Sequence, residues 1–260
     1  MIRGLQLFKD HFRDFQESFV VIGGTACDRL FAERSIPFRV TKDVDIVLLI
    51  ETLDDAFVRR FWEFIKAGGY RKQQRSEKRL YYRFQKPASA GYPDMLELFS
   101  RRLEQVDVGA GQTITIIPAG EDLSSLSAIL VDSAYYKLIK ETKTILDELP
   151  IVQANGLIPL KAKAWLDMTE RRANSERINE RDIKKHRNDV FGLSLILVDP
   201  PFALADSIRI DLQRFIASFP FNSKEWPYIL ASLGETYGVK FVPTEMVDTL
   251  VRHFDLTVPN

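Results

Sequence analysis

The chain has 260 residues, of which 45% are hydrophobic and 28% are charged. This composition provides enough apolar residues for a folded core and excludes general disorder. Lysine and arginine together number 36, as do aspartate and glutamate, so the formal net charge is zero. That balance argues against a protein that coats nucleic acid through a general basic excess. No apolar run approaches about 18 residues, so we expect no membrane-spanning helix and no membrane partner.

Two further features bear on the cellular compartment. The first ten residues carry charges where a signal peptide needs its apolar stretch. Cys27 is the only cysteine, so an internal disulfide or a metal site built from several cysteines is excluded. We therefore expect a cytoplasmic protein.

Up to about residue 157 the chain alternates between helical and strand-like patterns. Helices are predicted over residues 5–16, 25–34, 52–66 and 133–144, the last one capped by Asp132. Strands are predicted over residues 18–22, 44–50, 80–84, 95–99, 113–117, 128–131 and 149–153, with a turn at Asn155-Gly156.

From Pro159 onward the spacing of apolar residues is helical almost throughout. Helices are predicted near residues 160–172, 178–194, 200–217, 223–236 and 243–254. The predicted fold class is therefore α/β (α+β), with a mixed sheet flanked by helices over residues 1–157 and a helical bundle over residues 158–260.

The stretch Val21-Ile-Gly-Gly-Thr-Ala26 predicts a strand, a glycine turn and the start of a helix. Gly23 and Gly24 allow the backbone to approach a ligand closely. The free N–H groups and the dipole at the start of the next helix favour an anion such as a phosphate. A glycine turn that binds no ligand remains the alternative.

Asp43 and Asp45 lie two residues apart at the start of an apolar strand. Their side chains therefore leave the same face of that strand, where two neighbouring carboxylates repel one another. A divalent cation relieves this repulsion, and Mg²⁺ typically binds one or two carboxylates together with phosphate oxygens of a substrate. Alternatively, Asp43 caps the loop and Asp45 pairs with Lys42 or Arg39.

A phosphoryl-transfer site with metal ions usually needs a further acidic ligand. The stretch Tyr92-Pro-Asp-Met-Leu-Glu-Leu-Phe99 contains two candidates, Asp94 and Glu97. Glu97 lies between two leucines inside a predicted strand, where a charge is costly unless it has a partner. Asp94 follows Pro93 and fits a turn better. We therefore favour Glu97, with a water-facing residue at a sheet edge as the alternative.

Together these residues resemble the nucleotidyltransferase superfamily with the polymerase-β-like fold. The carrying motifs are Gly23-Gly24-Thr25, Asp43-x-Asp45 and the later acid Glu97. Leu160-Lys161-Ala-Lys-Ala164, followed by Lys185-His-Arg-Asn-Asp189, is similar to elements of the AbiEii-type nucleotidyltransferases, although His186 stands where that family usually has an aspartate. The resemblance covers about residues 18–195.

This resemblance implies a metal-dependent enzyme that moves a nucleoside monophosphate from an NTP to an acceptor. Asp43, Asp45 and Glu97 would bind Mg²⁺, while Gly23, Gly24, Thr25 and Lys42 would bind the nucleotide phosphates. Lys161 would reach the triphosphate and Asp189 would orient Lys161. The alternatives are a solvated lysine at a helix start and an aspartate that pairs with Arg187 or Lys185.

The resemblance also implies classes of partner. The family includes toxins of toxin–antitoxin and abortive-infection systems, so the acceptor would be an RNA such as tRNA, or a protein, and an antitoxin would be a cognate partner. Two other readings stay open: a non-catalytic module that senses nucleotides or binds a partner, and a small-molecule nucleotidyltransferase of the antibiotic-modifying type.

Overall fold

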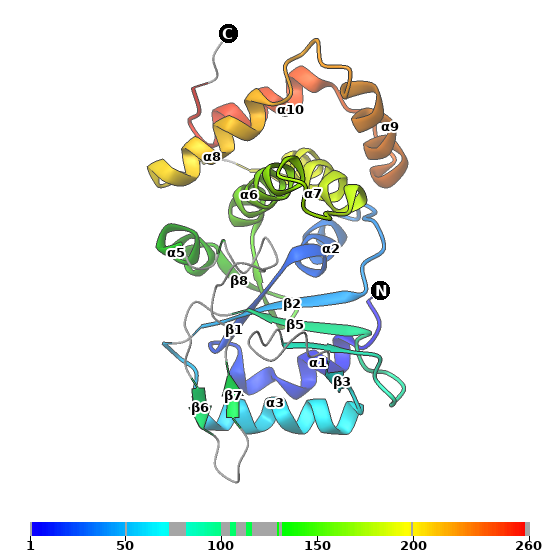
Figure 1. The fold of residues 1–260 in the computed structure, drawn as a ribbon, viewed down its shortest axis with the longest axis vertical. Coiled ribbons are helices and arrows are strands. Elements are labelled where there is room, and N and C mark those ends of the chain that lie inside the picture. Colours follow the sequence, from blue (N-terminus) through cyan, green and yellow to red (C-terminus); the bar gives the residue numbers. More distant parts are fainter. Residues whose placement is uncertain are drawn as a thin grey trace. The chain divides into compact units, whose positions relative to one another are not determined.

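The computed structural model of the protein (Figure 1) describes residues 2–49, 51–72, 82–99, 105–107, 113–115, 129, 132–198 and 200–257. The chain divides into two compact units that are interleaved along the sequence. The first unit comprises Met1–Ala26, Val40–Val131 and Lys143–Val152, and the second comprises Cys27–Arg39, Asp132–Thr142 and Gln153–Asn260. Residues 158–260 therefore belong to the second unit together with two earlier segments of the chain.

The first unit is built on a mixed sheet, which in the described residues has seven strands in the order β3-β4-β5-β2-β1-β9-β8. These strands are β1 (Phe19–Ile22), β2 (Asp43–Leu48), β3 (Arg71–Lys72), β4 (Tyr82–Gln85), β5 (Met95–Phe99), β8 (Lys143–Leu146) and β9 (Leu149–Val152). Strand β2 is antiparallel to β1 and parallel to β5, and β4 is antiparallel to β5. A separate hairpin consists of β6 (Gln105–Asp107) and β7 (Thr113–Thr115).

Helices α1 (Leu5–His11) and α3 (Asp55–Gly68) cover one face of this sheet, as Figure 1 shows. Phenylalanines from both helices pack against Phe19 of β1 and Phe84 of β4. The cluster consists of Phe8, Phe12, Phe19, Phe57, Phe61, Phe64 and Phe84, all of them almost fully buried. Burial of these aromatic rings stabilises this side of the sheet because it removes a large apolar area from water.

The two faces of β2 and β5 have opposite chemistry. In β2 the side chains of Val44 and Ile46 are buried, whereas Asp43 and Asp45 on the other face are partly exposed. In β5 Leu96 is buried and Glu97 is partly exposed. This alternation follows from the two-residue period of a strand, so the aromatic core on one face leaves the carboxylates on the other.

The second unit is helical. It contains α5 (Ser133–Glu141), α6 (Ala154–Ala173), α7 (Glu180–Leu193), α8 (Asp206–Ala217), α9 (Trp226–Tyr237) and α10 (Pro243–His253), together with most of α2 (Gly23–Glu33). Helix α6 packs against α5, α7 and α8, and α7 also contacts α9. The α/β fold class with a helical C-terminal part is thus confirmed. In the described part of the chain no helix is both long and apolar enough to cross a membrane.

The structure corrects three predicted elements. Helix α6 begins at Ala154, so no turn stands at 155–156 and Pro159 lies inside the helix. Pro159 is the sixth residue of this helix, where proline removes one backbone hydrogen bond and crowds the preceding turn, and burial of its neighbours Leu157, Ile158 and Leu160 offsets that cost. Helix α5 ends at Glu141, where β8 follows. Of the predicted strand at 128–131 only Ile129 is described, and it is helical.

Candidate active site

Three carboxylates lie on the face of the first unit's sheet opposite the aromatic cluster. In the strand register Asp45 of β2 lies directly opposite Glu97 of β5, and Asp43 lies opposite Met95. Neighbouring strands place such directly opposed side chains on one face and close together. Asp45 is also opposite Ile22, the last residue of β1, so the acidic pair lies beside the end of that strand. The sequence-predicted acids are therefore neighbours in space.

The glycine turn touches this acidic group. Gly23 follows β1 directly, begins α2 and has a φ of 67°. A Cβ atom at position 23 would overlap the carboxylate of Asp45 where it now lies, so the turn and that side chain are in direct contact. The turn and the doublet, which the sequence predicts separately, are therefore parts of one site.

Replacing Gly23 with alanine should destabilise the protein for two reasons. The positive φ alone costs about 1–2 kcal/mol for a residue with a Cβ atom, and the new methyl group must push Asp45 aside. Gly91→Ala is the matched control, because Gly91 has a φ of 83° but, among the residues that the structure describes, no atom lies within 4 Å of the added Cβ. Urea denaturation should show the larger loss for Gly23→Ala; equal losses would mean that the contact with Asp45 is unimportant.

Thr25 joins the helix start to the acidic strand. Its hydroxyl donates a hydrogen bond to the backbone carbonyl oxygen of Asp43 at 2.6 Å, and the residue is fully buried. Gly24 is buried as well. Thr25 therefore holds the first turn of α2 against β2, while the N–H groups of that turn are the groups that favour an anion.

Glu97 is linked to two neighbours. Its carboxylate forms an ion pair with Arg83 of β4, and it shares a hydrogen bond with Asp45. Two carboxyl groups can share a hydrogen bond only if one of them carries a proton. Burial raises the pKa of Glu97 despite the opposing charge of Arg83, and the nearby charge of Asp43 raises it further.

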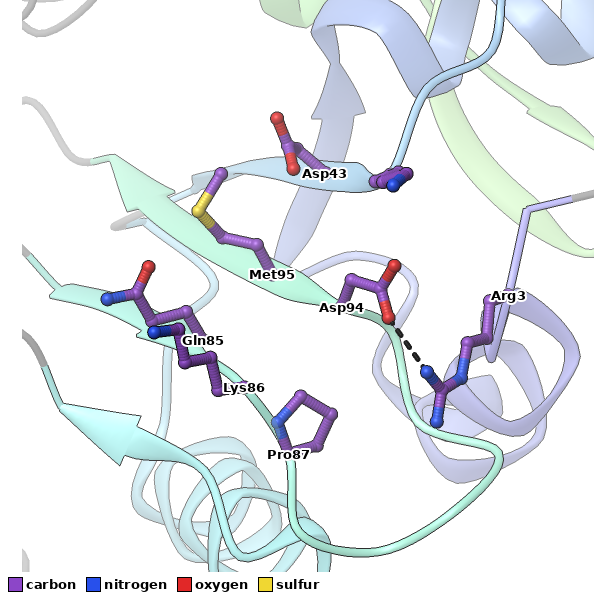
Figure 2. Close-up of a pocket in the computed structure, with 8 residues that line it drawn as sticks. Arg3, Asp43, Gln85, Lys86, Pro87, Asp94 and Met95 are labelled. Atoms are coloured by element: carbon purple, nitrogen blue, oxygen red, sulfur yellow. Dashed lines mark hydrogen bonds and ion pairs between the residues drawn. The ribbon is translucent and has the colours of Figure 1, made fainter.

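The other candidate acid, Asp94, points elsewhere. It precedes β5 and forms an ion pair with Arg3 at 3.1 Å, as Figure 2 shows. Glu97 is thus the acid that lies in the row of Asp43 and Asp45. Arg83 is the residue of this row that sequence reasoning missed. The sequence pattern could have predicted it, because Arg83 and Phe84 are consecutive in β4 and point to opposite faces, with the phenylalanine buried in the aromatic layer.

These side chains suit a Mg²⁺ ion whose remaining ligands come from a substrate. In the described residues no group of three or more Asp, Glu, His or Cys side chains is arranged as a metal-binding cluster. Mg²⁺, however, is usually bound by one or two carboxylates and completed by substrate phosphates and water. Asp43 and Asp45 fit that role, whereas the Arg83 contact competes for Glu97.

Lys42 borders a pocket beside this site. The pocket has a volume of about 320 Å³ and is lined by Arg3, Lys42, Asp43, Gln85, Lys86, Pro87, Asp94 and Met95. Figure 2 shows Asp43 and Met95 at one side, Gln85 and Lys86 at another, and the ion pair of Arg3 with Asp94 at a third. The lysine assigned to the nucleotide phosphates thus lines this pocket at the start of β2.

Lys161 and Asp189 meet inside the second unit. The ammonium of Lys161 contacts the Asp189 carboxylate at 2.7 Å, with side chains only 6% and 2% exposed. Arg39 contacts both oxygens of the same carboxylate, at 3.1 and 2.8 Å. The predicted contact of Asp189 with Lys161 is therefore present. Arg39, for which Asp45 was one candidate partner, pairs with Asp189 instead.

Burial is the largest single influence on the pKa values in this cluster, but for Asp189 and Lys161 the neighbouring charges together outweigh it. Burial by itself would raise the pKa of Asp189, but the nearby Lys161 and Arg39 outweigh it and hold that pKa below its usual value. Burial would lower the pKa of Lys161, yet Asp189 raises it overall. Burial also raises the pKa of the Cys27 thiol to about 12, so this cysteine stays protonated. Two cations thus share one carboxylate.

His186 adds a pH-sensitive group to the cluster. Burial and the neighbouring charge of Lys161 lower its pKa to about 3, and its Nδ1 has no hydrogen-bond partner among the described residues. Between about pH 6.5, the ordinary histidine value, and pH 3 the unfolded chain therefore binds a proton that the folded chain does not. Stability should fall as the pH drops through this range.

We expect this loss to reach at most about 1.4 kcal/mol per pH unit for the single histidine. Urea denaturation at pH 7.5, 6.0 and 5.0 should show a steeper acid decline for the wild type than for His186→Gln, since all other titrating groups are common to both. Parallel declines would show that His186 titrates alike in the folded and unfolded states.

Comparison with known proteins adds no assignment: no protein-family model matches the chain, and a search of the curated proteins finds no match.

Proposed function

We propose that the protein is a Mg²⁺-dependent nucleotidyltransferase that moves a nucleoside monophosphate from an NTP to an acceptor. The observation that carries this proposal is the contact of Gly23 with Asp45. It combines, within one unit, a glycine turn at a helix start with a row of carboxylates. The first of these favours phosphate and the second favours a divalent cation. The resemblance to the polymerase-β-like superfamily supports the same reaction.

The residues have distinct tasks in the proposed reaction. The first turn of α2 holds phosphates of the NTP through its backbone N–H groups, and Asp43 and Asp45 bind Mg²⁺, which supplies Lewis-acid stabilisation of the phosphate charge. The acceptor oxygen forms a bond to the α-phosphorus, the bond from that phosphorus to the bridging oxygen breaks, and pyrophosphate leaves. A carboxylate of the Asp45–Glu97 pair accepts the proton of the acceptor hydroxyl.

The direct test is transfer of label from α-³²P-labelled NTPs into cellular RNA and protein, with and without Mg²⁺. We expect Mg²⁺-dependent labelling of a macromolecule and stoichiometric release of pyrophosphate. If none of the four NTPs gives labelling or pyrophosphate, the proposed reaction is wrong. The toxin role and a cognate antitoxin rest on the family resemblance alone, and expression of the chain in a bacterial host, with growth as the readout, tests them.

A second candidate function is a nucleotide-binding module without catalysis. The ion pair of Glu97 with Arg83 favours it, because that arginine neutralises the third carboxylate of the row. Such a module needs no metal to relieve repulsion at Glu97. Calorimetry separates the two functions: NTP binding of equal affinity in EDTA and in Mg²⁺, with no pyrophosphate released over hours, would favour the binding module over the enzyme.

A further inference from the structure

We propose that the pocket bordered by Lys42 and Lys86 binds a phosphate group of the acceptor, so that the acceptor is an anionic, phosphate-bearing molecule. This inference rests on the proposed function, because it gives the second substrate of that reaction a place and a chemical class. It moves Lys42 from the nucleotide to the acceptor.

The position of the pocket supports this role. In the strand order β4-β5-β2-β1, the glycine turn follows β1, whereas the pocket is lined by residues at the start of β2 and β5 and at the end of β4. Asp43 itself lines the pocket, and Asp45, two residues further along the same face, contacts the glycine turn. The carboxylates thus separate a phosphate site at the turn from the pocket, which is the arrangement that two substrates need.

The charges of the pocket favour an anion. Three cationic side chains line it, and one of them, Arg3, is paired with Asp94. In the part of the chain that the structure describes, neither the Lys42 nor the Lys86 ammonium is paired with a carboxylate, and both residues are exposed. With three cationic and two acidic side chains, the pocket has a net charge of one positive unit when no metal is bound, and of two when Asp43 is engaged with a cation. A polycationic acceptor such as an aminoglycoside would be repelled there.

The backbone around the pocket is held in unusual conformations. Lys86 has a φ of 53°, a left-handed conformation that residues with a side chain rarely adopt, and its N–H donates to the Asp94 carbonyl at 3.2 Å. Gly4, with a φ of 72°, lies so close to Pro93 that a Cβ atom would overlap that backbone. This close approach places the neighbouring Arg3 beside Asp94.

The size of the pocket suits a small part of a larger acceptor. A volume of about 320 Å³ is at the lower end of small-molecule sites, enough for a phosphate and its sugar. Two sources of such a group are a single-stranded RNA and a free mononucleotide. The exposed lysines at the rim suit a continuing phosphodiester chain, so RNA is the acceptor that we expect.

The test is binding to the 260-residue chain in EDTA without NTP, with two probes. One is a fluorescein-labelled single-stranded RNA 12-mer, followed by anisotropy between 0.05 and 0.3 M salt. The other is AMP, followed by calorimetry. The variant is Lys42→Gln combined with Lys86→Asn, since asparagine tolerates the left-handed conformation. The matched control is Arg59→Gln combined with Lys66→Gln, two exposed cations on α3, which covers the opposite sheet face.

Loss of two phosphate contacts should lower the slope of log K against log salt by about 1.4 and weaken RNA binding about 25-fold at 0.1 M salt, with the control within twofold of wild type. A loss confined to AMP would instead support a phosphorylated small-molecule acceptor. If the pocket variant binds both probes as the wild type does, the proposal is overturned. Failure of this proposal can be told apart from failure of the proposed function. Binding to the pocket is measured without NTP or metal, whereas a wrong enzyme assignment would show as unchanged nucleotide transfer by the Asp43 and Asp45 variants.

Discussion

Asp45→Asn is expected to lower nucleotide transfer by about 10³-fold without unfolding the protein. The substitution keeps the shape of the side chain but removes one of the charges that would bind Mg²⁺ in the proposed site. Asp43→Asn should act in the same way. The measurement is the initial rate of label transfer from an α-³²P-labelled NTP at saturating Mg²⁺, with thermal unfolding followed in parallel.

The melting temperature of the variant shows whether a loss of transfer comes from the site or from unfolding. Asp45 shares a hydrogen bond with Glu97, which also feels the charge of Asp43, so removing one charge relieves repulsion in the row. The melting temperature of Asp45→Asn should therefore stay within about 2 °C of the wild type. Glu63→Gln, an exposed carboxylate on α3, is the matched control and should transfer label at the wild-type rate. Full activity of both aspartate variants would remove these residues from the catalytic site.

Asp189→Ala should cause the largest loss of stability, about 3–5 kcal/mol in the free energy of unfolding. The reason is that Lys161 and Arg39 would both lose the carboxylate they share, and the Lys161 side chain is only 6% exposed. A buried ammonium without a partner must either lose its proton or remain poorly solvated. Urea denaturation at pH 7.5, followed by circular dichroism, measures the change.

A double variant separates the lost pair from lost packing. Lys161→Met combined with Asp189→Leu replaces the buried Lys161–Asp189 pair with apolar side chains and leaves only Arg39, whose side chain is 28% exposed, without its carboxylate. We therefore expect the double variant to be more stable than Asp189→Ala alone. If Asp189→Ala changes the unfolding free energy by less than about 0.5 kcal/mol, the cluster contributes no more than an ordinary surface ion pair.

Protonation of Asp189 should lower the stability of the fold as the pH falls, in the same direction as the effect expected from His186. Because the folded-state pKa of Asp189 lies below its unfolded value, its ion pairs contribute stability above about pH 3.9 and lose it as the pH falls toward the folded pKa. The histidine acts over the higher range, from about pH 6.5 downward. Acid unfolding of the wild type should thus begin with His186 and continue with Asp189.

Features that depend on local rules could be predicted from the sequence. The two-residue period of a strand places Asp43 and Asp45 on one face, and Glu97, flanked by two leucines, follows from the same rule in β5. The end of β1 at the diglycine pair and the helix after it were predictable because glycines end an apolar strand, although the helix begins at Gly23 rather than at Thr25. Each of these inferences needs only neighbours within a few positions along the chain.

Features that depend on distant neighbours could not be predicted. Arg39 and Asp189 are 150 positions apart, so only the packed chain selects this partner over Asp45. The extension of α6 back to Ala154 is a second case: proline and glycine signals locally favour a turn, and the burial of several apolar side chains in the folded unit outweighs them.

The sequence by itself determined the strand that holds the acidic doublet, the glycine turn before it and the helical C-terminal half, because backbone preferences and periodicity act over a few residues. Only the tertiary structure decided that Gly23 contacts Asp45, that Arg83 neutralises Glu97 and that Lys42 borders a pocket. Those outcomes depend on which strands become neighbours, and strand order is set by burial of the whole aromatic core rather than by any short stretch of residues.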